Sequence, residues 1–301
     1  MWVAFALLSS FFLSIYDIFK KVSLQNNLVI SVLYISSVFG ALIFVVPLLL
    51  SSYYPCFENY PLFYIAPQSL TAHLMFFAKS ALVGSSWLFA YFALKHLPIT
   101  IVSAIRSSSP LWTLLGAVIY FKEQLNVYQW IGIMVTVISY SIFGNLGHKE
   151  GIRLKGNKWI FFAIAATLLG SISALNDKYL VANYNRIAMQ AWFAIYMPIF
   201  LLPFLIAEKR YLSIKGTTFQ WRYTIPLIGI TLVIADFVYF YALSQPGSLI
   251  SMVSALRRTS VVFTFFLAGI FLKEKNVKKK LLVLMGILLG IGLIIYGSGK
   301  Q

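Results

Sequence analysis

The sequence predicts an all-α integral membrane protein with ten transmembrane helices, arranged as two inverted repeats of five helices. Three observations predict this fold: the composition, a series of long apolar runs and an internal repeat. Of the 301 residues, 60% are hydrophobic and 11% are charged, whereas about 25% of the residues are charged in a soluble domain. A soluble fold of this length has too little interior to bury so much apolar surface. The composition therefore excludes a soluble enzyme, a disordered regulator and a secreted disulfide scaffold.

Ten apolar runs approach the roughly 20 residues that a helix needs to cross the hydrocarbon core of a bilayer. They cover residues 2–19, 28–50, 70–94, 99–121, 127–144, 158–177, 187–207, 223–243, 248–271 and 281–297. The first run lacks a basic start and a small-residue cleavage site, so we expect a retained span rather than a signal peptide. We expect two domains of five spans each, at residues 1–147 and 148–301.

The two halves of the chain resemble each other. Residues 102–123 (VSAIRSSSPLWTLLGAVIYFKE) align without a gap with residues 253–274 (VSALRRTSVVFTFFLAGIFLKE), and both segments contain an arginine and end in Lys-Glu. A two-residue insertion upstream extends the match, so that Trp87 corresponds to Asp236. Because each half holds an odd number of spans, the second half enters the bilayer in the opposite orientation. Such inverted repeats are typical of transporters that open a central site alternately to the two sides.

These features resemble the EamA branch of the drug/metabolite transporter superfamily. The most specific segment is LPITIVSAIRSSSPLWTLLGAVIYFKEQLNVYQWIGIMV, residues 97–135. The resemblance implies a central cavity lined by spans one, three, four, six, eight and nine. It also implies that spans five and ten pack together, and Gly286 and Gly290 form a GxxxG pattern in span ten that permits close approach. Many members end spans four and nine in Gly-Glu, where this chain has Lys122-Glu123 and Lys273-Glu274.

The basic residues predict an orientation in the cell (inner) membrane. Of the 24 lysines and arginines, 16 follow odd-numbered spans, and four follow even-numbered spans or lie near the termini. The positive-inside rule then places both termini outside the cell, whereas the family resemblance implies that both lie inside. We follow the charges. Basic loops also suit anionic lipid headgroups, so the net charge of +16 does not indicate nucleic-acid binding.

Three arginines inside predicted spans point to an anion site: Arg106, Arg257 and Arg258. A guanidinium group in the membrane costs about 3 kcal/mol or more unless it meets a partner or a wet cavity. Guanidinium groups stay charged and bind carboxylate and phosphate through two parallel hydrogen bonds. We predict an anion clamp, and the alternative is a structural ion pair with an acid such as Asp236. The basic doublet is also similar to one in the triose-phosphate and nucleotide-sugar branch of the superfamily, which implies the same anion-binding role.

Three acids inside or near the spans are candidates for ion coupling. Asp236 lies near the centre of span eight, where it is either a proton-coupling group or the counter-ion of the arginine doublet. Asp17 precedes Lys20 by three residues, and Asp177 is next to Lys178. For these two acids, the alternative to coupling is an ion pair at the end of a helix.

Three aromatic residues are candidates for substrate contact: Trp87, Tyr91 and Tyr239. Their rings can stack on a substrate or close a gate, and the alternative is that they face lipid. Trp87 is the strongest candidate because the repeat pairs it with the inward-facing Asp236.

The sequence therefore predicts a secondary active transporter of a small organic metabolite, anionic or zwitterionic, that works by alternating access. The alternatives are a flippase of a lipid-linked phosphate or a broad exporter of amphipathic compounds. No cluster of catalytic residues and no phosphate-binding loop are present, so we expect neither an enzyme nor an ATP-driven pump. Only Cys56 and three separated histidines could bind metal, so we expect no metal site and no cofactor. The expected partners are the substrate, the lipid bilayer and a proton or counter-substrate, with the protein a monomer or a homodimer.

Overall fold

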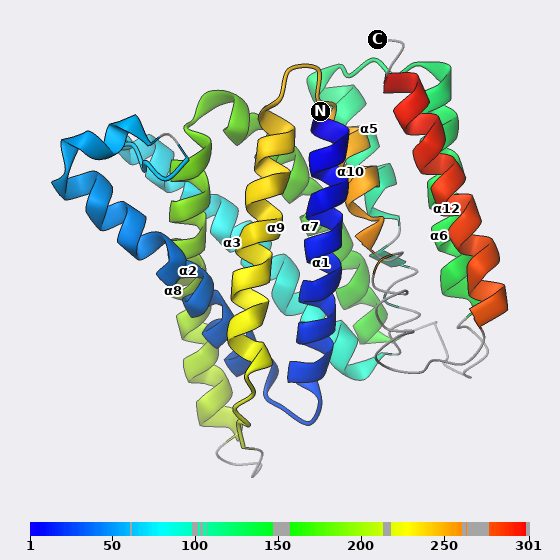
Figure 1. Ribbon diagram of the computed structural model, residues 1–301. Helices are drawn as coiled ribbons and strands as arrows, with labels where there is room; N and C mark the ends of the chain where they lie inside the picture. The colour runs from blue at the N-terminus through cyan, green and yellow to red at the C-terminus, as the bar shows by residue number, and fades with distance from the viewer. Residues whose placement is uncertain are drawn as a thin grey trace.

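A computed structural model of the chain describes residues 1–60, 62–97, 102, 105–106, 108–146, 157–212, 218–260, 263 and 277–298. These residues form ten α-helices and one short 3-10 helix, and no strand occurs among them. The elements are α1 (Trp2–Leu24), α2 (Val29–Tyr53), η1 (Pro55–Asn59), α3 (Leu70–His96), α5 (Ser109–Phe121), α6 (Val127–Leu146), α7 (Lys158–Asn183), α8 (Arg186–Leu212), α9 (Thr224–Ser244), α10 (Ile250–Arg257) and α12 (Val277–Ser298). The all-α prediction is confirmed for this part of the chain (Figure 1).

Six helices are long and apolar enough to cross a membrane: α1, α2, α3, α7, α8 and α9. Shorter apolar helices cover Ser109–Phe121, Val127–Ser139 and Leu288–Gly297. A helix therefore lies within each of the ten predicted spans, while the number of membrane crossings stays a prediction. The second Lys-Glu pair, Lys273-Glu274, is outside the described residues.

Two of the helices that run further than predicted carry candidate acids. Helix α1 ends at Leu24 and α7 ends at Asn183, so Asp17 and Asp177 lie within helices. The prediction that these acids mark helix ends was wrong. The physical reason is that each acid has a lysine partner within the bundle, so neither needs the membrane surface to stay charged.

Each main contact between helices joins the two halves of the chain. Helix α1 packs on α9, α3 on α7, α2 on α8, α5 on α10 and α6 on α12. Figure 1 shows α6 beside α12 at one edge of the bundle and α1 beside α9. If spans one and three correspond to spans six and eight, the α1–α9 and α3–α7 contacts are equivalent by the repeat.

Close glycine contacts bring α6 and α12 together. A Cβ atom added to Gly132 would lie 2.7 Å from the carbonyl oxygen of Gly290, and one added to Gly290 would lie 2.8 Å from that of Gly132. Gly286 likewise faces the hydroxyl of Ser139. The predicted packing of spans five and ten is confirmed, and the GxxxG glycines permit it.

The largest buried apolar cluster lies at the end of the bundle that carries both termini (Figure 1). It combines Phe76 of α3, Phe240 and Leu243 of α9, and the first turns of α10, including Ile250 and Val253. These five side chains are at most 2% exposed. Apolar side chains therefore fill the bundle at this end.

Candidate functional site

A cavity of about 180 Å³ lies in the middle of the bundle, beside this apolar cluster. Its walls come from α1, α3, α7, α9 and α10, from Arg106 and Ser109 in span four, and from Phe193 of α8. Apart from Phe193, these are the six spans that the family resemblance implied. The predicted central cavity is therefore confirmed in its position.

The cavity carries an excess of positive charge. Its basic lining residues are Lys20, Lys79, Arg106, Arg257 and Arg258, and its acidic lining residues are Asp177 and Asp236. A third acid, Asp17, is paired with Lys20. Five positive charges against three negative charges leave an excess of two within the described residues. In a membrane interior such an excess favours an anion as the missing partner.

Arg257 is neutralised by an acid of its own half. It forms an ion pair with Asp236, and its guanidinium carbon lies 4.0 Å from the centre of the Tyr239 ring. Its Nε atom is buried without a hydrogen-bond partner among the described residues. Asp236 is thus in ion-pair contact with one arginine of the doublet, while its part in coupling stays a prediction.

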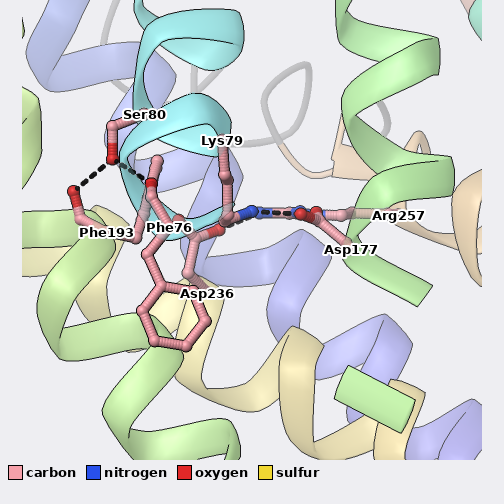
Figure 2. Close-up of polar contacts among 7 residues, drawn as sticks. All are labelled: Phe76, Lys79, Ser80, Asp177, Phe193, Asp236 and Arg257. Atoms are coloured by element: carbon pink, nitrogen blue, oxygen red, sulfur yellow. Dashed lines mark hydrogen bonds and ion pairs between the residues drawn. The ribbon is translucent and has the colours of Figure 1, made fainter. Parts of the chain in front are cut away.

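A second buried ion pair joins the two halves and was not predicted. Lys79 of α3 pairs with Asp177 of α7, and the lysine nitrogen lies 4.6 Å from the centre of the Phe193 ring. Lys79 is 1% exposed. Figure 2 shows this pair next to the pair of Asp236 and Arg257. A lysine inside an apolar run indicates that the lysine has a buried acidic partner, but the sequence alone does not identify that partner.

The predicted partner of Asp177 was therefore wrong. Lys178 points away from Asp177 and donates hydrogen bonds to the backbone oxygen and the hydroxyl of Ser248, at 2.5 and 3.1 Å. Successive residues of a helix point about 100° apart, so neighbours in sequence do not share a face.

The Asp17–Lys20 pair is confirmed, although it lies within α1. The side chain of Lys20 reaches the cavity, with its nitrogen 4.5 Å from the centre of the Tyr16 ring and 5.6 Å from that of Tyr91. Lys20 therefore belongs to the cavity wall, a role that the sequence did not indicate.

Arg106 and Arg258 are the two remaining basic residues of the cavity lining. Arg106 takes part in none of the three ion pairs found within the described residues. The repeat aligns Arg106 with Arg257, but the position that corresponds to Asp236 holds Trp87, which has no charge. Arg258 donates a hydrogen bond of 3.0 Å to the hydroxyl of Ser109.

The three predicted aromatic residues, Trp87, Tyr91 and Tyr239, all line the cavity. The hydroxyls of Tyr91 and Tyr16 are 3.3 Å apart. The aromatic residues therefore face the interior and not lipid, while their contact with a substrate stays a prediction.

The model of the EamA-like transporter family matches residues 1–144 and 157–296, one segment in each half of the chain. The chain belongs to the EamA-like transporter family. This EamA-like protein is accordingly a multi-pass membrane protein, and its family consists of transporters rather than enzymes.

Comparison with solved structures supports the fold of this EamA-like transporter. A crystal structure, titled only as that of a protein, covers 99% of this chain and 93% of its own, with a TM-score of 0.65 and 12% sequence identity. At this identity the likeness shows the fold alone. Among curated proteins no match is found.

Proposed function

We propose that the protein is a secondary active transporter that moves a small organic metabolite, anionic or zwitterionic, across the membrane by alternating access. The observation that carries the proposal is the positive excess in the central cavity, with Arg106 outside the described ion pairs. A carboxylate or phosphate held by Arg106, with Arg258 and Lys20 on the same wall, would balance that charge.

Alternating access requires the two halves to separate at one face of the membrane at a time. Two carboxylates tie the halves together. Helix α2 follows Leu28 and receives no side-chain cap from its own N-cap residue. Instead, Glu208 of α8 accepts hydrogen bonds from the backbone nitrogens of Ile30 and Ser31, at 3.0 and 2.7 Å, and from the hydroxyl of Ser31, at 2.8 Å.

The same arrangement recurs at the start of α10. Its N-cap residue, Leu249, provides no side-chain cap. Glu123, just beyond α5, accepts hydrogen bonds from the backbone nitrogens of Ile250 and Ser251, at 2.7 and 3.3 Å, and from the hydroxyl of Ser251, at 2.6 Å. A carboxylate at a helix N-terminus is favoured by the free N–H groups and the helix dipole.

We call these two contacts the Glu123 clamp and the Glu208 clamp. Helix α10 begins at the end of the bundle that carries the termini, and α2 begins at the opposite end (Figure 1). Each clamp joins one half to the other, so opening a face by moving the halves apart breaks the clamp at that face. Both clamps are formed in this conformation, and the apolar cluster lies on the side of the Glu123 clamp.

The charge count predicts that the termini lie outside the cell. The membrane would then be the inner membrane, and the face of the Glu208 clamp would be cytoplasmic. Energy would come from a proton or from exchange of a second solute. Asp177 and Asp236 are the candidates for coupling because both acids line the cavity. A monomer contains both halves, and a homodimer stays a prediction.

The decisive experiment is counterflow in proteoliposomes with phosphorylated metabolites, carboxylates and neutral amino acids. Saturable exchange of an anion that is lost in Arg106→Gln supports the proposal. Arg210→Gln is the matched control, because Arg210 is an exposed arginine near the end of α8. Exchange of neutral or cationic solutes that is unchanged in Arg106→Gln would contradict it.

A further inference from the structure

A smaller cavity of about 40 Å³ adjoins the central one. It lies between α2, α3, α8 and α9, and it shares part of its wall with the central cavity. The shared residues are Tyr16, Trp87, Tyr91, Phe193, Leu232 and Asp236. Four aromatic rings therefore stand where the two spaces meet, and a substrate in the central cavity can extend along them.

One side chain in this smaller cavity has an unmet hydrogen bond. Gln190 of α8 is 1% exposed, and its Nε2 atom donates a hydrogen bond of 2.9 Å to the backbone oxygen of Val233. Its Oε1 atom is buried and has no hydrogen-bond partner among the described residues. The contact with Val233 fixes the amide, because exchanging oxygen and nitrogen would bring two oxygen atoms together.

The neighbouring serine hydroxyls do not donate a hydrogen bond to the Oε1 atom of Gln190. The Ser36 hydroxyl donates to the backbone oxygen of Leu33 at 2.9 Å, and the Ser37 hydroxyl donates to that of Tyr34 at 2.7 Å. Their hydrogens are thus used within α2. A buried carbonyl oxygen without a donor is costly, so a site of this kind selects molecules that bring a donor.

We propose that Gln190 is a specificity-determining residue that accepts a hydrogen bond from the substrate. This inference rests on the proposed function and narrows it. The substrate is an organic anion with an apolar skeleton, whose anionic group lies by Arg106 and whose far end carries an O–H or N–H group. A water molecule needs roughly 10–15 Å³ measured in this way, so the smaller cavity holds a group of a few atoms.

The test uses pairs of carboxylates that differ by one hydroxyl group. The pairs are hexanoate with 6-hydroxyhexanoate, and 3-phenylpropanoate with 3-(4-hydroxyphenyl)propanoate. Each compound competes with the anion that the full-length protein exchanges in proteoliposomes. In the wild type, we expect the hydroxylated member of at least one pair to compete about tenfold better.

Two variants assign that preference to Gln190. Gln190→Met keeps the length of the side chain but removes both polar atoms, so both members of a pair should compete equally. Gln25→Met is the matched control at an exposed glutamine after α1 and should behave as the wild type.

The outcomes separate this inference from the proposed function. If the wild type treats the members of both pairs alike, or if the preference survives in Gln190→Met, the inference is wrong. It is equally wrong if none of the four compounds competes for an anion that is exchanged. If no anion is exchanged at all, the proposed function itself fails. The wild-type comparison needs no variant, so a misfolded Gln190→Met protein does not prevent the test.

Discussion

The two halves of the chain place an arginine at the same position of the repeat but surround it differently. In the second half, Arg257 pairs with Asp236 and lies against the ring of Tyr239. In the first half, Arg106 has Trp87 at the position that corresponds to Asp236. Duplication supplies two similar scaffolds that can exchange conformations, whereas an asymmetric substrate needs an asymmetric site. The arginine of the second half is held in an ion pair, and we propose that the arginine of the first half binds the substrate.

The largest effect is expected from breaking the ion pair between Arg257 and Asp236 in the second half. Asp236→Asn leaves Arg257 without its counter-ion, and the side chains of Arg257 and Asp236 are only 21% and 11% exposed. We expect a loss of about 3 kcal/mol in the free energy of unfolding, because an uncompensated buried charge is costly. Thermal unfolding of the purified protein in detergent measures this.

The double variant Asp236→Asn/Arg257→Gln is the control, and it should recover most of the lost stability because it removes both charges. A double variant as unstable as Asp236→Asn would show that the ion pair is not the source of the effect.

Substitution of Arg106 should have the opposite effect: a large loss of transport and little loss of stability. Arg106→Gln is expected to lower anion exchange about 100-fold, or roughly 2.7 kcal/mol, while the unfolding temperature stays within 2–3 °C or so of the wild type. Arg106→Lys should give an intermediate rate, because lysine keeps the charge but loses the fork of two parallel donors. Uptake kinetics and thermal unfolding together check this. If Arg106→Gln destabilised the protein as much as Asp236→Asn, Arg106 would be a structural residue like Arg257.

The clamps allow the comparison to be extended to the two faces of the membrane. Glu123→Gln should favour opening at the face of the termini, and Glu208→Gln should favour opening at the other face. We expect each to change accessibility about tenfold, or roughly 1.4 kcal/mol. The reporter is Ser173→Cys, in the cavity wall, in a Cys56→Ser background that removes the exposed native cysteine.

A membrane-impermeant maleimide, applied to right-side-out and inside-out vesicles, reads this accessibility. Opposite changes in the two variants support the clamps as gates. Changes in the same direction would mean that both carboxylates only stabilise the fold.

The smallest effect is expected at Lys178. The sequence suggested Asp177 as its partner, whereas in the structure Lys178 contacts Ser248. Lys178→Met should cost about 1 kcal/mol of stability, because it removes a hydrogen-bonded but partly solvated contact with Ser248. Lys79→Met should cost several times more, because it leaves Asp177 buried and alone. Thermal unfolding compares the two, and equal losses would contradict the assignment of Lys79 as the partner.

These contrasts also show what the sequence can and cannot predict. The family resemblance implied the six spans around the cavity, and the repeat relates spans one, three and four to spans six, eight and nine. An ion pair between Asp236 and the arginine doublet was one of two predicted alternatives, because opposite charges deep in a membrane stabilise each other, but the sequence did not choose between Arg257 and Arg258. The partner of Lys79 was not predictable, because Asp177 lies in the other half and no spacing rule connects the two residues.

The clamps were missed for a related reason. Glu123 lies in the repeat, but the repeat gives it no partner, because capping rules apply to a polar residue next to the helix that it caps. The available signal was the absence of a local cap. Leu28 and Leu249 precede helices that hold an Ile-Ser pair in the first turn and receive no side-chain cap from their own N-cap residues. An uncapped buried helix start implies a partner elsewhere.

The lack of a local cap on α2 affects how the helix forms during synthesis. When Ile30 and Ser31 leave the ribosome, the carboxylate that completes the first turn of α2 has not yet been synthesised, because Glu208 lies 177 residues beyond Ser31. The start of α2 stays incomplete in the newly inserted first half, and the second half finishes it on arrival. Glu123, in the first half, completes the start of α10 in the same way. Each half thus acts as a template for the other, and assembly in the membrane is completed only when both are present.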